Sequence, residues 1–578
     1  MARLVACRLA GNLMRRPPTT GRRHSHVRRR GSHRTGPNTH RPPVTTPEER
    51  LEVPSSTLRP QRPTVTSATE LAGEIGLRHG VLVDGALVDA TDDVGVTGIE
   101  LRAQSILAGD LFAALPGARS HGAAFAGEAL ERGAVAVVTD DEGVALMIGS
   151  GVPDGTAVLV HPQPRSILGT LSAAVHDRPS DKMTVIGITG TSGKTTTSYL
   201  VEAALRAAGR TPGLIGTIET RIGTEPVPSA LTTPEAPNLH AMFAAMYEQG
   251  VDTVVMEVSS HALSLGRVDG TTFAVGAFTN LSQDHLDFHL TFEDYFAAKA
   301  RLFAEDSPVR ADRAVVCVDD RWGRRMAEIA AAGGRAAPLT VATTTEGTAS
   351  WSVTSWSSGP DGTQQFEVAA RDTVVSASLR MPGRYNVANA VVAAAVCAEV
   401  GVDPAVALAA MAEVDVPGRM QRVERGQDFL AVVDYAHKPA ALEAVLATLR
   451  AQTDGRIAVV VGAGGDRDAE KRPLMGEAAA RAADLVVITD DNPRSEDPAA
   501  IRAAVRRGAD AVGGSAEVRE ISPRDEAIHA VVQWAKDGDV VLIAGKGHEV
   551  GQDVGGIKYP FDDRRVLADA LDRQKGSM

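Results

Sequence analysis

The sequence is poor in aromatic residues (4%) and contains only three cysteines among its 578 residues. Because Cys7, Cys317 and Cys397 lie far apart and form no CxxC pair, the sequence predicts neither a disulfide framework nor a zinc site, as is typical of a reducing cytosol. No apolar run reaches the ~20 residues that cross a bilayer, so no membrane insertion is expected. The net charge of -12 argues against nucleic acid as the main partner.

Residues 1–60 form a segment whose composition differs from the rest. Its first fifty residues include twelve arginines and no acid before Glu48. Too few apolar side chains are present to form a core, so a disordered basic tail is predicted. A dispensable tail or an upstream-extended start is favoured over an organelle-targeting segment, because the stretch has no clear amphipathic period.

The remaining chain alternates short apolar runs with helix-like segments, which predicts an α/β fold with mostly parallel sheets. We expect three domains: a small mixed α/β domain at 61–180, a central domain at 181–416 and a C-terminal domain at 417–578. Strands are predicted at Ala134–Val138, Met183–Ile188, Thr253–Met256, Phe273–Phe278, Ala314–Val318, Phe429–Val433, Ile457–Val461, Leu485–Ile488 and Val540–Ile543.

The strongest local pattern is "VIGITGTSGKTTTSYL" at 185–200, a strand followed by a glycine-rich loop and a helix start. The N–H groups of Gly190 to Gly193 can surround phosphate oxygens, Lys194 can contact the β and γ phosphates, and the Thr195 hydroxyl can hold Mg²⁺. Ile188 stands where the strict pattern has glycine, so this is a variant loop. The alternative is a glycine-rich turn without a ligand.

Two further strands of the central domain end in polar residues. Glu257 in "VVMEVSSHAL" is suited to hold a second Mg²⁺ or its water, although many strands end in an acid. "FTNLSQDHLDFH" brings Asn280, Asp284, His285 and Asp287 together. From the residues alone these side chains are either ligands or a capped loop.

Three strand ends of the C-terminal domain carry charged loops: "GAGGDRDAEKRP", "TDDNPRSEDP" and "AGKGHE". Ligands bind outside the carboxyl ends of strands in a doubly wound sheet, so these loops are expected to converge on one small charged molecule. Acids can hold an ammonium and arginines can pair with carboxylates, which favours an amino acid. The residues concerned are Arg467, Asp491, Asn492, Arg494, Lys546 and Glu549. Any one of them taken alone is better interpreted as a solvated polar or charged side chain of a loop.

Taken together, the motifs resemble those of the Mur ligases, and especially the members that add meso-diaminopimelate. The likeness covers nearly everything after the tail, through "GITGTSGKTTT", "LTTPEAP", "EVSSHAL", "FTNLSQDHLDFH", "YFAAKARLF", "GRYNVANA", "DYAHKPAAL", "GAGGDRDAEKRPLMG", "DNPR" and "GKGHE". It implies an N-domain that binds the UDP precursor, a central P-loop-type ATPase domain and a C-terminal Rossmann-like domain that binds the amino acid. The implied reaction is ATP-dependent addition of meso-diaminopimelate to the D-glutamate of UDP-N-acetylmuramoyl-L-alanyl-D-glutamate through an acyl phosphate, in peptidoglycan synthesis.

The resemblance also implies roles for individual residues. ATP binding falls to Gly190, Thr191, Ser192, Gly193, Lys194, Thr195, Thr196, Asn280, Asn389, Arg419 and Asp434, with Asn386 nearby. The implied catalytic residues are Lys194, Glu257, His285 and Lys299, with Mg²⁺ at Thr195 and Glu257 and with Lys299 carbamylated to N6-carboxylysine. The UDP precursor is assigned to Thr232, Thr233, Ser260 and Arg267, and diaminopimelate to Arg467, Asp491, Asn492, Pro493, Arg494, Gly545 and Glu549.

Arg494 gives a hypothesis for specificity. Meso-diaminopimelate differs from lysine by a second carboxylate. Pro493 has a fixed φ that stiffens the loop, so Arg494 is held in position to bind this carboxylate. An amino acid without the second carboxylate would leave the arginine unpaired. Two departures from the family pattern are visible. "VTGIELRAQS" lacks the usual Asp-Ser-Arg, so no uridine contacts are assigned there, and Ser192 replaces a common Asn.

The implied cofactors are ATP and Mg²⁺, and the expected partners are small-molecule substrates only, for a monomer in the cytoplasm. Three alternatives stay open. The chain is another amide ligase, either lysine-adding or folylpolyglutamate synthetase-like, against which "DNPR" and "GKGHE" argue. It is a non-catalytic scaffold, against which the intact Lys194, Thr195, Glu257 and Lys299 argue. Or it is a nucleotide switch, which would not need an amino-acid pocket.

Overall fold

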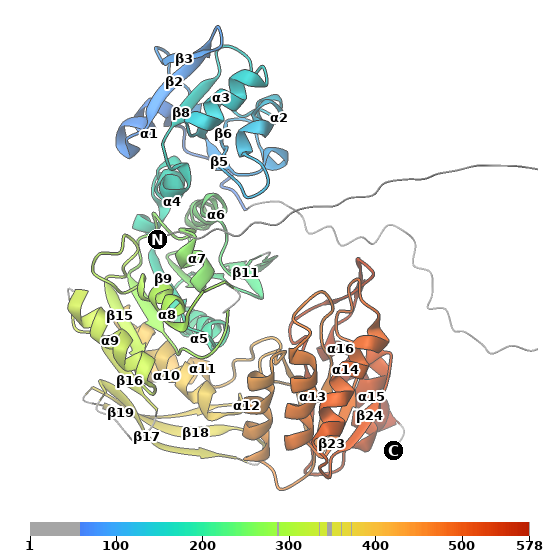
Figure 1. Ribbon diagram of the computed structural model, residues 1–578. Helices are drawn as coiled ribbons and strands as arrows, with labels where there is room; N and C mark the ends of the chain where they lie inside the picture. Colours follow the sequence, from blue (N-terminus) through green and yellow to red (C-terminus); the bar gives the residue numbers. More distant parts are fainter. Residues whose placement is uncertain are drawn as a thin grey trace, which may run out of the picture. The chain divides into compact units, whose positions relative to one another are not determined.

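The computed structural model describes residues 58–576 except 230, 286–287, 334–335, 344–348, 360 and 372 (Figure 1). Residues 1–57, which hold most of the predicted tail, and Asp287 therefore lie outside the described residues. The described contacts begin slightly before the predicted end of the tail at residue 60. Leu58 packs against a core of the central sheet, and Arg59 pairs with Asp110 (2.5 Å) and Glu100 (3.6 Å).

The first part of the described chain is a mixed sheet of six strands. The strand order is β3 (Ala86–Asp89), β2 (Arg78–Val83), β8 (Ala157–Val160), β7 (Ala136–Thr139), β6 (Asp110–Ala113), β5 (Gly98–Glu100). The pairs from β8 to β5 are parallel, and β2 pairs antiparallel with both β3 and β8. A small sheet pairs β1 (Thr66–Ser67) with β4 (Gly95–Val96). The helices are α1 (Ala68–Ile75), α2 (Ala126–Glu131), α3 (Asp141–Gly149) and α4 (Pro164–Val175).

The central sheet joins eleven of the described strands. Its middle, from β10 to β17, is parallel, and two antiparallel strands extend each end. The strand order is β12 (Glu225–Pro228), β11 (Glu219–Ile222), β10 (Pro212–Ile215), β13 (Thr253–Glu257), β9 (Thr184–Thr189), β14 (Val275–Phe278), β15 (Arg313–Cys317), β16 (Leu339–Ala342), β17 (Trp351–Ser358), β18 (Gln364–Ala370), β19 (Thr373–Leu379) (Figure 1). Its helices are α5 (Lys194–Ala207), α6 (Ala236–Glu248), α7 (Ser260–Ser264), α8 (Phe292–Ala300), α9 (Arg321–Gly333), α10 (Arg384–Glu399) and α11 (Pro404–Met411).

The last sheet is also mostly parallel, with one antiparallel edge strand. Its order is β20 (Gln421–Arg422), β21 (Leu430–Asp434), β25 (Val540–Ala544), β22 (Ile457–Val461), β23 (Leu485–Ile488), β24 (Glu517–Glu520). A separate hairpin follows, formed by β26 (Gly551–Val554) and β27 (Ile557–Pro560). The helices are α12 (Pro439–Arg450), α13 (Lys471–Ala482), α14 (Pro498–Ala511), α15 (Arg524–Trp534) and α16 (Asp563–Gly576).

Helices cover both faces of the parallel strands in the middle of the central and last sheets, where successive residues point to opposite sides and both sets are apolar. In β9, Ile186 and Ile188 enter the core beneath α5, α10 and α11, whereas Val185 enters the core beneath α6 to α9. In β22, Val459 packs under α12 to α14 and Val460 under α15 and α16. Such doubly covered parallel sheets expose their strand ends, and the carboxyl ends are where polar loops can form a site.

These three sheets confirm the predicted α/β class with mostly parallel sheets. They fall at 78–160, 184–379 and 421–544, and the exact domain bounds stay predictions. None of the described helices is long and apolar enough to cross a membrane.

Candidate active site

The loop between β9 and α5 has the backbone of a phosphate-binding turn. Gly190 (φ 148°) and Gly193 (φ 87°) lie where side chains are strained, and a Cβ would collide with Thr279 Oγ1 at Gly190 and with Asn389 Oδ1 at Gly193. The first turn of α5 follows at once, with Thr196 buried in it. Its free N–H groups and the positive end of the helix dipole suit a phosphate.

Two lysines, the half-buried Lys194 and the buried Lys299, converge on the carbonyl groups of this loop. Lys194 Nζ donates to Gly190 O (3.0 Å) and Thr191 O (2.9 Å), and Lys299 Nζ, from α8, donates to Gly190 O (2.9 Å). Burial lowers the pKa of both amines, and the adjacent charge of Lys194 helps to bring the pKa of Lys299 well below its usual value. Lys299 is only 1% exposed and has no carboxylate within ion-pair distance among the described residues.

Glu257, at the end of β13, is held by neutral donors. Thr195 Oγ1 donates to its two oxygens at 3.0 and 2.9 Å, and Thr217 contributes its N–H (2.7 Å) and hydroxyl (3.1 Å). The Thr217 hydroxyl also contacts Thr232 Oγ1 (3.0 Å), and the Thr233 hydroxyl donates to Glu257 O (2.8 Å). The predicted metal ligands are therefore in contact, and they are joined to two residues predicted for the UDP precursor.

Asn280, in the segment after β14, braces the phosphate loop. Its side-chain oxygen accepts from Ser192 N–H (3.0 Å), its amide donates to Ser192 O (3.0 Å), and its carbonyl accepts from Thr191 N–H (2.9 Å). Because β14 pairs with β9, the phosphate loop is held in shape from the end of the neighbouring strand.

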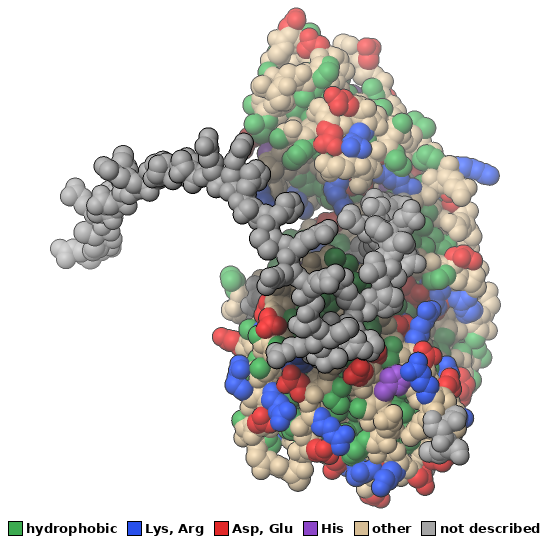
Figure 2. All heavy atoms as spheres, turned by 90° about the vertical axis from the view of Figure 1, so that its right-hand side faces the viewer, with side chains coloured by type: hydrophobic (Ala, Val, Ile, Leu, Met, Phe, Trp, Pro, Cys, Tyr) green, Lys and Arg blue, Asp and Glu red, His purple; other side chains and the backbone are tan. Residues whose placement is uncertain are grey.

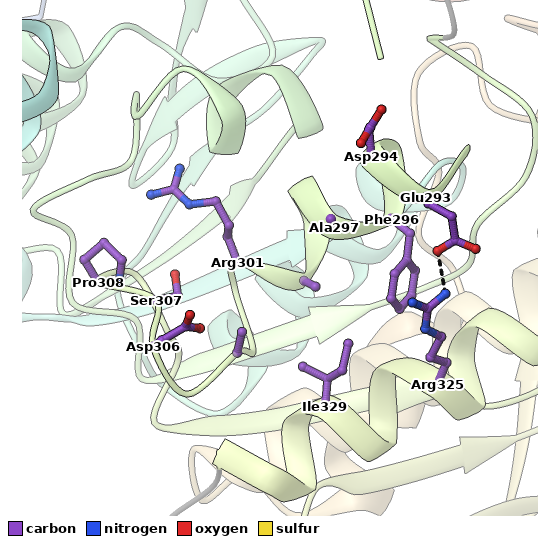
Figure 3. A pocket seen from close by; sticks show the side chains of 12 residues that line it. Glu293, Asp294, Phe296, Ala297, Arg301, Asp306, Ser307, Pro308, Arg325 and Ile329 are labelled. Carbon is purple, nitrogen blue, oxygen red and sulfur yellow. Dashed lines mark hydrogen bonds and ion pairs between the residues drawn. The ribbon is translucent and has the colours of Figure 1, made fainter. Parts of the chain in front are cut away.

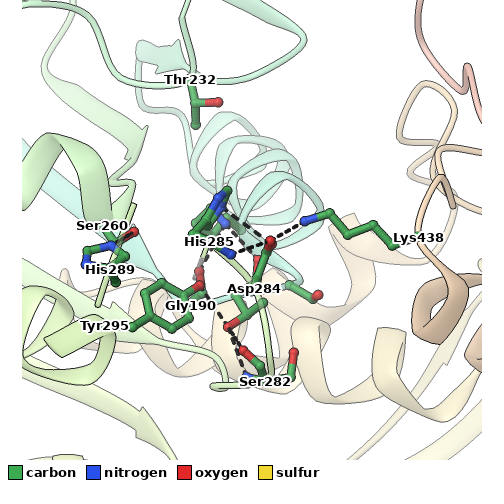
Figure 4. Close-up of polar contacts among 12 residues, drawn as sticks. Gly190, Thr232, Ser260, Ser282, Asp284, His285, His289, Tyr295 and Lys438 are labelled. Carbon is green, nitrogen blue, oxygen red and sulfur yellow. Dashed lines mark hydrogen bonds and ion pairs between the residues drawn. The ribbon is translucent and has the colours of Figure 1, made fainter. Parts of the chain in front are cut away.

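The loop before α8 carries a second polar group (Figure 4). Asp284 pairs with Lys438 and lies 3.4 Å from His285 Nε2. Burial lowers the pKa of His285 to about 4, so the imidazole is neutral near pH 7. Figure 4 also shows Ser260 beside His289, whose Nε2 lies 2.9 Å from the Ser260 hydroxyl.

The residues predicted around the nucleotide include a buried arginine atom without a partner. Arg419 stacks 4.5 Å from the ring centroid of Tyr435, and its buried Nε has no hydrogen-bond acceptor among the described residues. Asp434 accepts from the N–H groups of Met420 (2.7 Å) and Ala436 (2.8 Å), and burial raises its pKa. An orphaned guanidinium nitrogen next to the phosphate-loop elements suits a phosphate oxygen.

At the carboxyl ends of β23 and β25, the predicted amino-acid residues form a connected cluster. Asn492 Nδ2 donates to Glu549 Oε2 (2.8 Å), and Lys546 Nζ donates to Asn492 Oδ1 (3.0 Å) and Glu549 Oε2 (3.1 Å). Asp491 is buried beside Gly545, where a Cβ would lie 2.7 Å from Asp491 Oδ2. Arg467 lies on the exposed loop after β22, outside this cluster of contacts.

Arg494 is fixed by its backbone as well as by its side chain. It has a left-handed φ of 52°, its N–H donates to Asp553 O (2.9 Å), and its carbonyl accepts from Gly555 N–H (2.6 Å). Nη1 donates to Gly465 O (2.7 Å), which leaves the remaining N–H groups of the guanidinium for another acceptor. The hairpin β26–β27 thus holds the loop that carries this arginine, in addition to the restraint predicted from Pro493.

The loop that carries Arg494 is joined to the Arg467 loop and to the start of α13 by contacts of Glu496 that the sequence did not reveal. Arg472 donates to both oxygens of Glu496, at 2.7 and 2.9 Å, and Glu496 also accepts from Asp466 N–H (2.5 Å). Each of these residues had a charge that could be read from the sequence, but nothing in their spacing indicated the pairing.

The remaining predicted residue for the UDP precursor, Arg267, lies beside Thr233. Its Nη1 donates to Thr233 O (3.4 Å), and its Nε lies 2.8 Å from Glu235 Oε1. Thr217 and His289 were missed because a threonine after a strand and a histidine in a loop carry no distinctive sequence signal.

A hollow of about 530 Å³ lies against the other side of α8 and α9, and it is not this site (Figure 3). It contains Phe296 and an ion pair of Glu293 with Arg325 (2.5 Å), and none of the predicted site residues lines it. On the face shown in Figure 2, Lys and Arg side chains are interspersed with Asp and Glu, with no basic patch on the part that is visible.

Three family models match successive parts of the chain. They are described as Mur ligase family, catalytic domain (residues 95–174), Mur ligase middle domain (188–397) and Mur ligase, glutamate ligase domain (418–547).

Proteins named UDP-N-acetylmuramoyl-L-alanyl-D-glutamate–2,6-diaminopimelate ligase are similar over most of their length. The one from Corynebacterium efficiens is 53% identical over 85% of this chain and 93% of its own. The one from Streptomyces avermitilis is 47% identical over 89% and 99%.

A solved structure of a protein with the same name matches with a TM-score of 0.63 and 32% identity, over 89% of this chain and 100% of that chain. A MurF ligase from Thermotoga maritima in complex with ADP matches with a TM-score of 0.55 at 20% identity, over 83% and 98%, which shows a shared fold.

Proposed function

The chain belongs to the Mur ligase family, and we propose that it joins meso-diaminopimelate to the D-glutamate of UDP-N-acetylmuramoyl-L-alanyl-D-glutamate with ATP, in peptidoglycan synthesis. The observation that carries this assignment is the cluster at the ends of β23 and β25. There Arg494 keeps free guanidinium donors, and the carboxylates of Asp491 and Glu549 lie on neighbouring loops. An amino acid with two carboxylates and two ammonium groups suits both charges.

ATP binding is proposed for the phosphate loop and the residues that brace it. Lys194 would exchange its bonds to Gly190 O and Thr191 O for phosphate oxygens, and Arg419 Nε would gain an acceptor. Asn280 keeps the loop in shape through its hydrogen bonds to Ser192, and Thr279 and Asn389 fill the space that side chains at Gly190 and Gly193 would need. The loop N–H groups and Lys194 then stabilise the charge of the γ-phosphoryl group as it moves.

Mg²⁺ fits Thr195 and Glu257, because a hydroxyl and a carboxylate are the hard oxygen ligands that it prefers. The described residues contain no group of three His, Cys, Asp or Glu that would form a complete metal cage, so water and phosphate oxygens would supply the other ligands. Bound there, the ion would neutralise phosphate charge. His285, neutral near pH 7, lines the same cleft in this proposal.

Carbamylation of Lys299 is proposed on the state of its amine. Burial and the adjacent charge of Lys194 bring the pKa of this amine well below its usual value, which favours its neutral, nucleophilic form, and no carboxylate pairs with it in the described part of the chain. Attack of the amine on CO₂ forms an N–C bond and releases one proton. The product places an anion next to Lys194, which would then have a partner of opposite charge.

The reaction proceeds in two steps. An oxygen of the D-glutamate γ-carboxylate takes the γ-phosphoryl group, which releases ADP and gives an acyl phosphate. The amine of diaminopimelate then attacks the carbonyl carbon, the bond from carbon to the phosphate oxygen breaks, phosphate leaves, and the amine loses a proton. Thr232, Thr233, Ser260 and Arg267 are proposed to hold the UDP precursor, with positioning as the dominant effect.

We further propose the domain bounds 61–180, 181–416 and 417–578, a cytoplasmic location where these precursors are made, and a monomer whose partners are its small-molecule substrates. Phosphate release from ATP tests the function, with the UDP-muramoyl-dipeptide held constant and diaminopimelate, lysine or glutamate varied. Release that depends on diaminopimelate is expected. Equal release with lysine, or preference for glutamate, would point to one of the other ligases, and no substrate-dependent release would point to a scaffold.

A further inference from the structure

Lys546 is a buried charge to which the proposed reaction gives no role. It follows Gly545 at the end of β25 and is 0% exposed, among the largest wholly buried side chains of the described residues. A lysine amine without any water contact needs acceptors close by. Its acceptors are Asn492 Oδ1 (3.0 Å) and Glu549 Oε2 (3.1 Å), both predicted to bind the amino acid.

These contacts fix the orientation of the Asn492 amide. Its oxygen accepts from Lys546 Nζ and from Asp553 N–H (3.0 Å), and both are donors only. The amide nitrogen must therefore face the opposite way, and there it donates to Glu549 Oε2 (2.8 Å). Without the lysine, one of the two donors that hold the amide would be lost.

The same contacts leave one oxygen of Glu549 for a ligand. Oε2 accepts from both Lys546 and Asn492, whereas Oε1 has no donor among the described residues, and the side chain is 32% exposed. A ligand ammonium group that binds Oε1 would meet a carboxylate whose orientation Lys546 and Asn492 have already fixed. Pre-orientation of this kind lowers the entropic cost of binding.

We propose that Lys546 is a positioning residue for amino-acid recognition, acting through Asn492 and Glu549 and not touching the substrate. The proposal rests on the function proposed above. It predicts a loss confined to diaminopimelate, because ATP and the UDP precursor are assigned to other loops.

The test is Lys546→Met, which keeps an unbranched side chain one atom shorter and removes the charge, with steady-state phosphate release as the assay. The KM for diaminopimelate is expected to rise at least tenfold, with the KM for ATP and for the UDP precursor changed less than twofold. Lys536→Met is the matched control, since Lys536 is exposed in the same domain and precedes β25, whereas the cluster lies at the carboxyl end of that strand; it is expected to leave all three values unchanged.

A double-mutant cycle separates positioning from general packing. If Lys546 acts through Glu549, the double variant Lys546→Met/Glu549→Gln will show much less than the product of the two single effects on KM. Multiplied effects, or a similar change in all three KM values, would overturn the proposal. If a thermal melt shows that Lys546→Met does not fold, Lys546→Gln replaces it, because glutamine keeps an N–H donor. This variant should raise the KM for diaminopimelate at least threefold, and an unchanged KM in a folded protein would overturn the proposal.

Wild-type protein assayed in parallel distinguishes failure of the role proposed for Lys546 from failure of the proposed function. Diaminopimelate-dependent release by the wild type together with an unchanged KM in the variant rejects only the role of Lys546. Absence of such release by the wild type rejects the proposed function, and the role of Lys546 with it.

Discussion

Replacement of Arg494 by alanine is expected to weaken diaminopimelate binding by roughly 60-fold. Nη1 already donates to Gly465 O at 2.7 Å, so the arginine is fixed before the ligand arrives and its remaining donors are free. Hydrogen bonds to charged groups contribute ~1.5–3 kcal/mol, and for this half-buried side chain a loss of about 2.5 kcal/mol corresponds to roughly 60-fold at 1.4 kcal/mol per tenfold. The strain of the left-handed φ of 52° does not differ between arginine and alanine, because both carry a Cβ.

The assay is phosphate release with each substrate varied in turn. In Arg494→Ala the KM for diaminopimelate should rise by that factor, while the KM for ATP and kcat/KM for lysine stay within about threefold, which is less than 1 kcal/mol. The enzyme's preference for diaminopimelate over lysine should fall in proportion, since lysine lacks the second carboxylate. Arg507→Ala is the matched control, an exposed arginine on α14 in the same domain. An unchanged KM for diaminopimelate and an unchanged preference over lysine would refute the recognition of a carboxylate by Arg494.

Three further outcomes follow from buried groups. Activity should fall in CO₂-free buffer and return with bicarbonate in the wild type but not in Lys299→Met. In CO₂-free buffer at pH 7 that variant should melt at a higher temperature than the wild type, and the difference should shrink as pH rises toward 10, because the folded lysine, with its lowered pKa, binds protons less tightly than the unfolded one. Gly193→Ala should abolish ATP binding in a calorimetric titration while the melting temperature changes little, since its Cβ would enter the space of Asn389 at the loop and not in a core; normal ATP affinity would contradict the loop assignment. Asp563→Asn should lower the free energy of unfolding by ~3–5 kcal/mol in urea, because it leaves the wholly buried Arg524 (2.7 Å) without its counter-charge; a change below ~1 kcal/mol would show that the pair does not act as a buried ion pair.

The buried parallel strands could be predicted from the sequence because they are continuous apolar runs. Ile457–Val461 and Leu485–Ile488 were predicted with the bounds that the structure has. Others differ at the ends: the strand predicted at Phe273–Phe278 begins at Val275, and Met183–Ile188 is shifted by one residue to Thr184–Thr189. Apolar side chains just outside a ladder are buried like those within it, so hydropathy alone cannot locate the end of a strand.

The antiparallel strands β17 to β19 were not predicted, although they carried a weaker signal. Trp351 and Val353 point inward from β17, and Phe366 and Val368 from β18, with polar residues between them. This is the alternation with period two that half-buried strands show, but the many Ser and Thr residues on the outer face hide it among loops. A strand whose sheet is covered by helices on one face only has a less distinct hydropathy pattern than the continuous apolar run of a strand covered on both faces.

For the site, the sequence indicated which residues carry charge but not which of them are buried. Lys299 looked like a helix-surface lysine, yet α8 turns Tyr295 and Lys299, four residues apart, toward the phosphate loop. Only the resemblance to a family pointed to it. Burial depends on which face of α8 meets β9, and that is a tertiary fact that no local pattern contains.

Glu257 and Glu549, the two carboxylates proposed to bind different cations, have different kinds of hydrogen-bond donor. The direct donors to Glu257 are the hydroxyl and N–H groups of threonines, which are neutral, so the carboxylate keeps its full charge for a divalent ion. Glu549 instead accepts from the ammonium of Lys546, which offsets part of its charge. A carboxylate so offset would bind a divalent ion poorly but could still orient a substrate ammonium. The different neighbours therefore support the proposed separation of a metal site at Glu257 from an amino-acid site at Glu549.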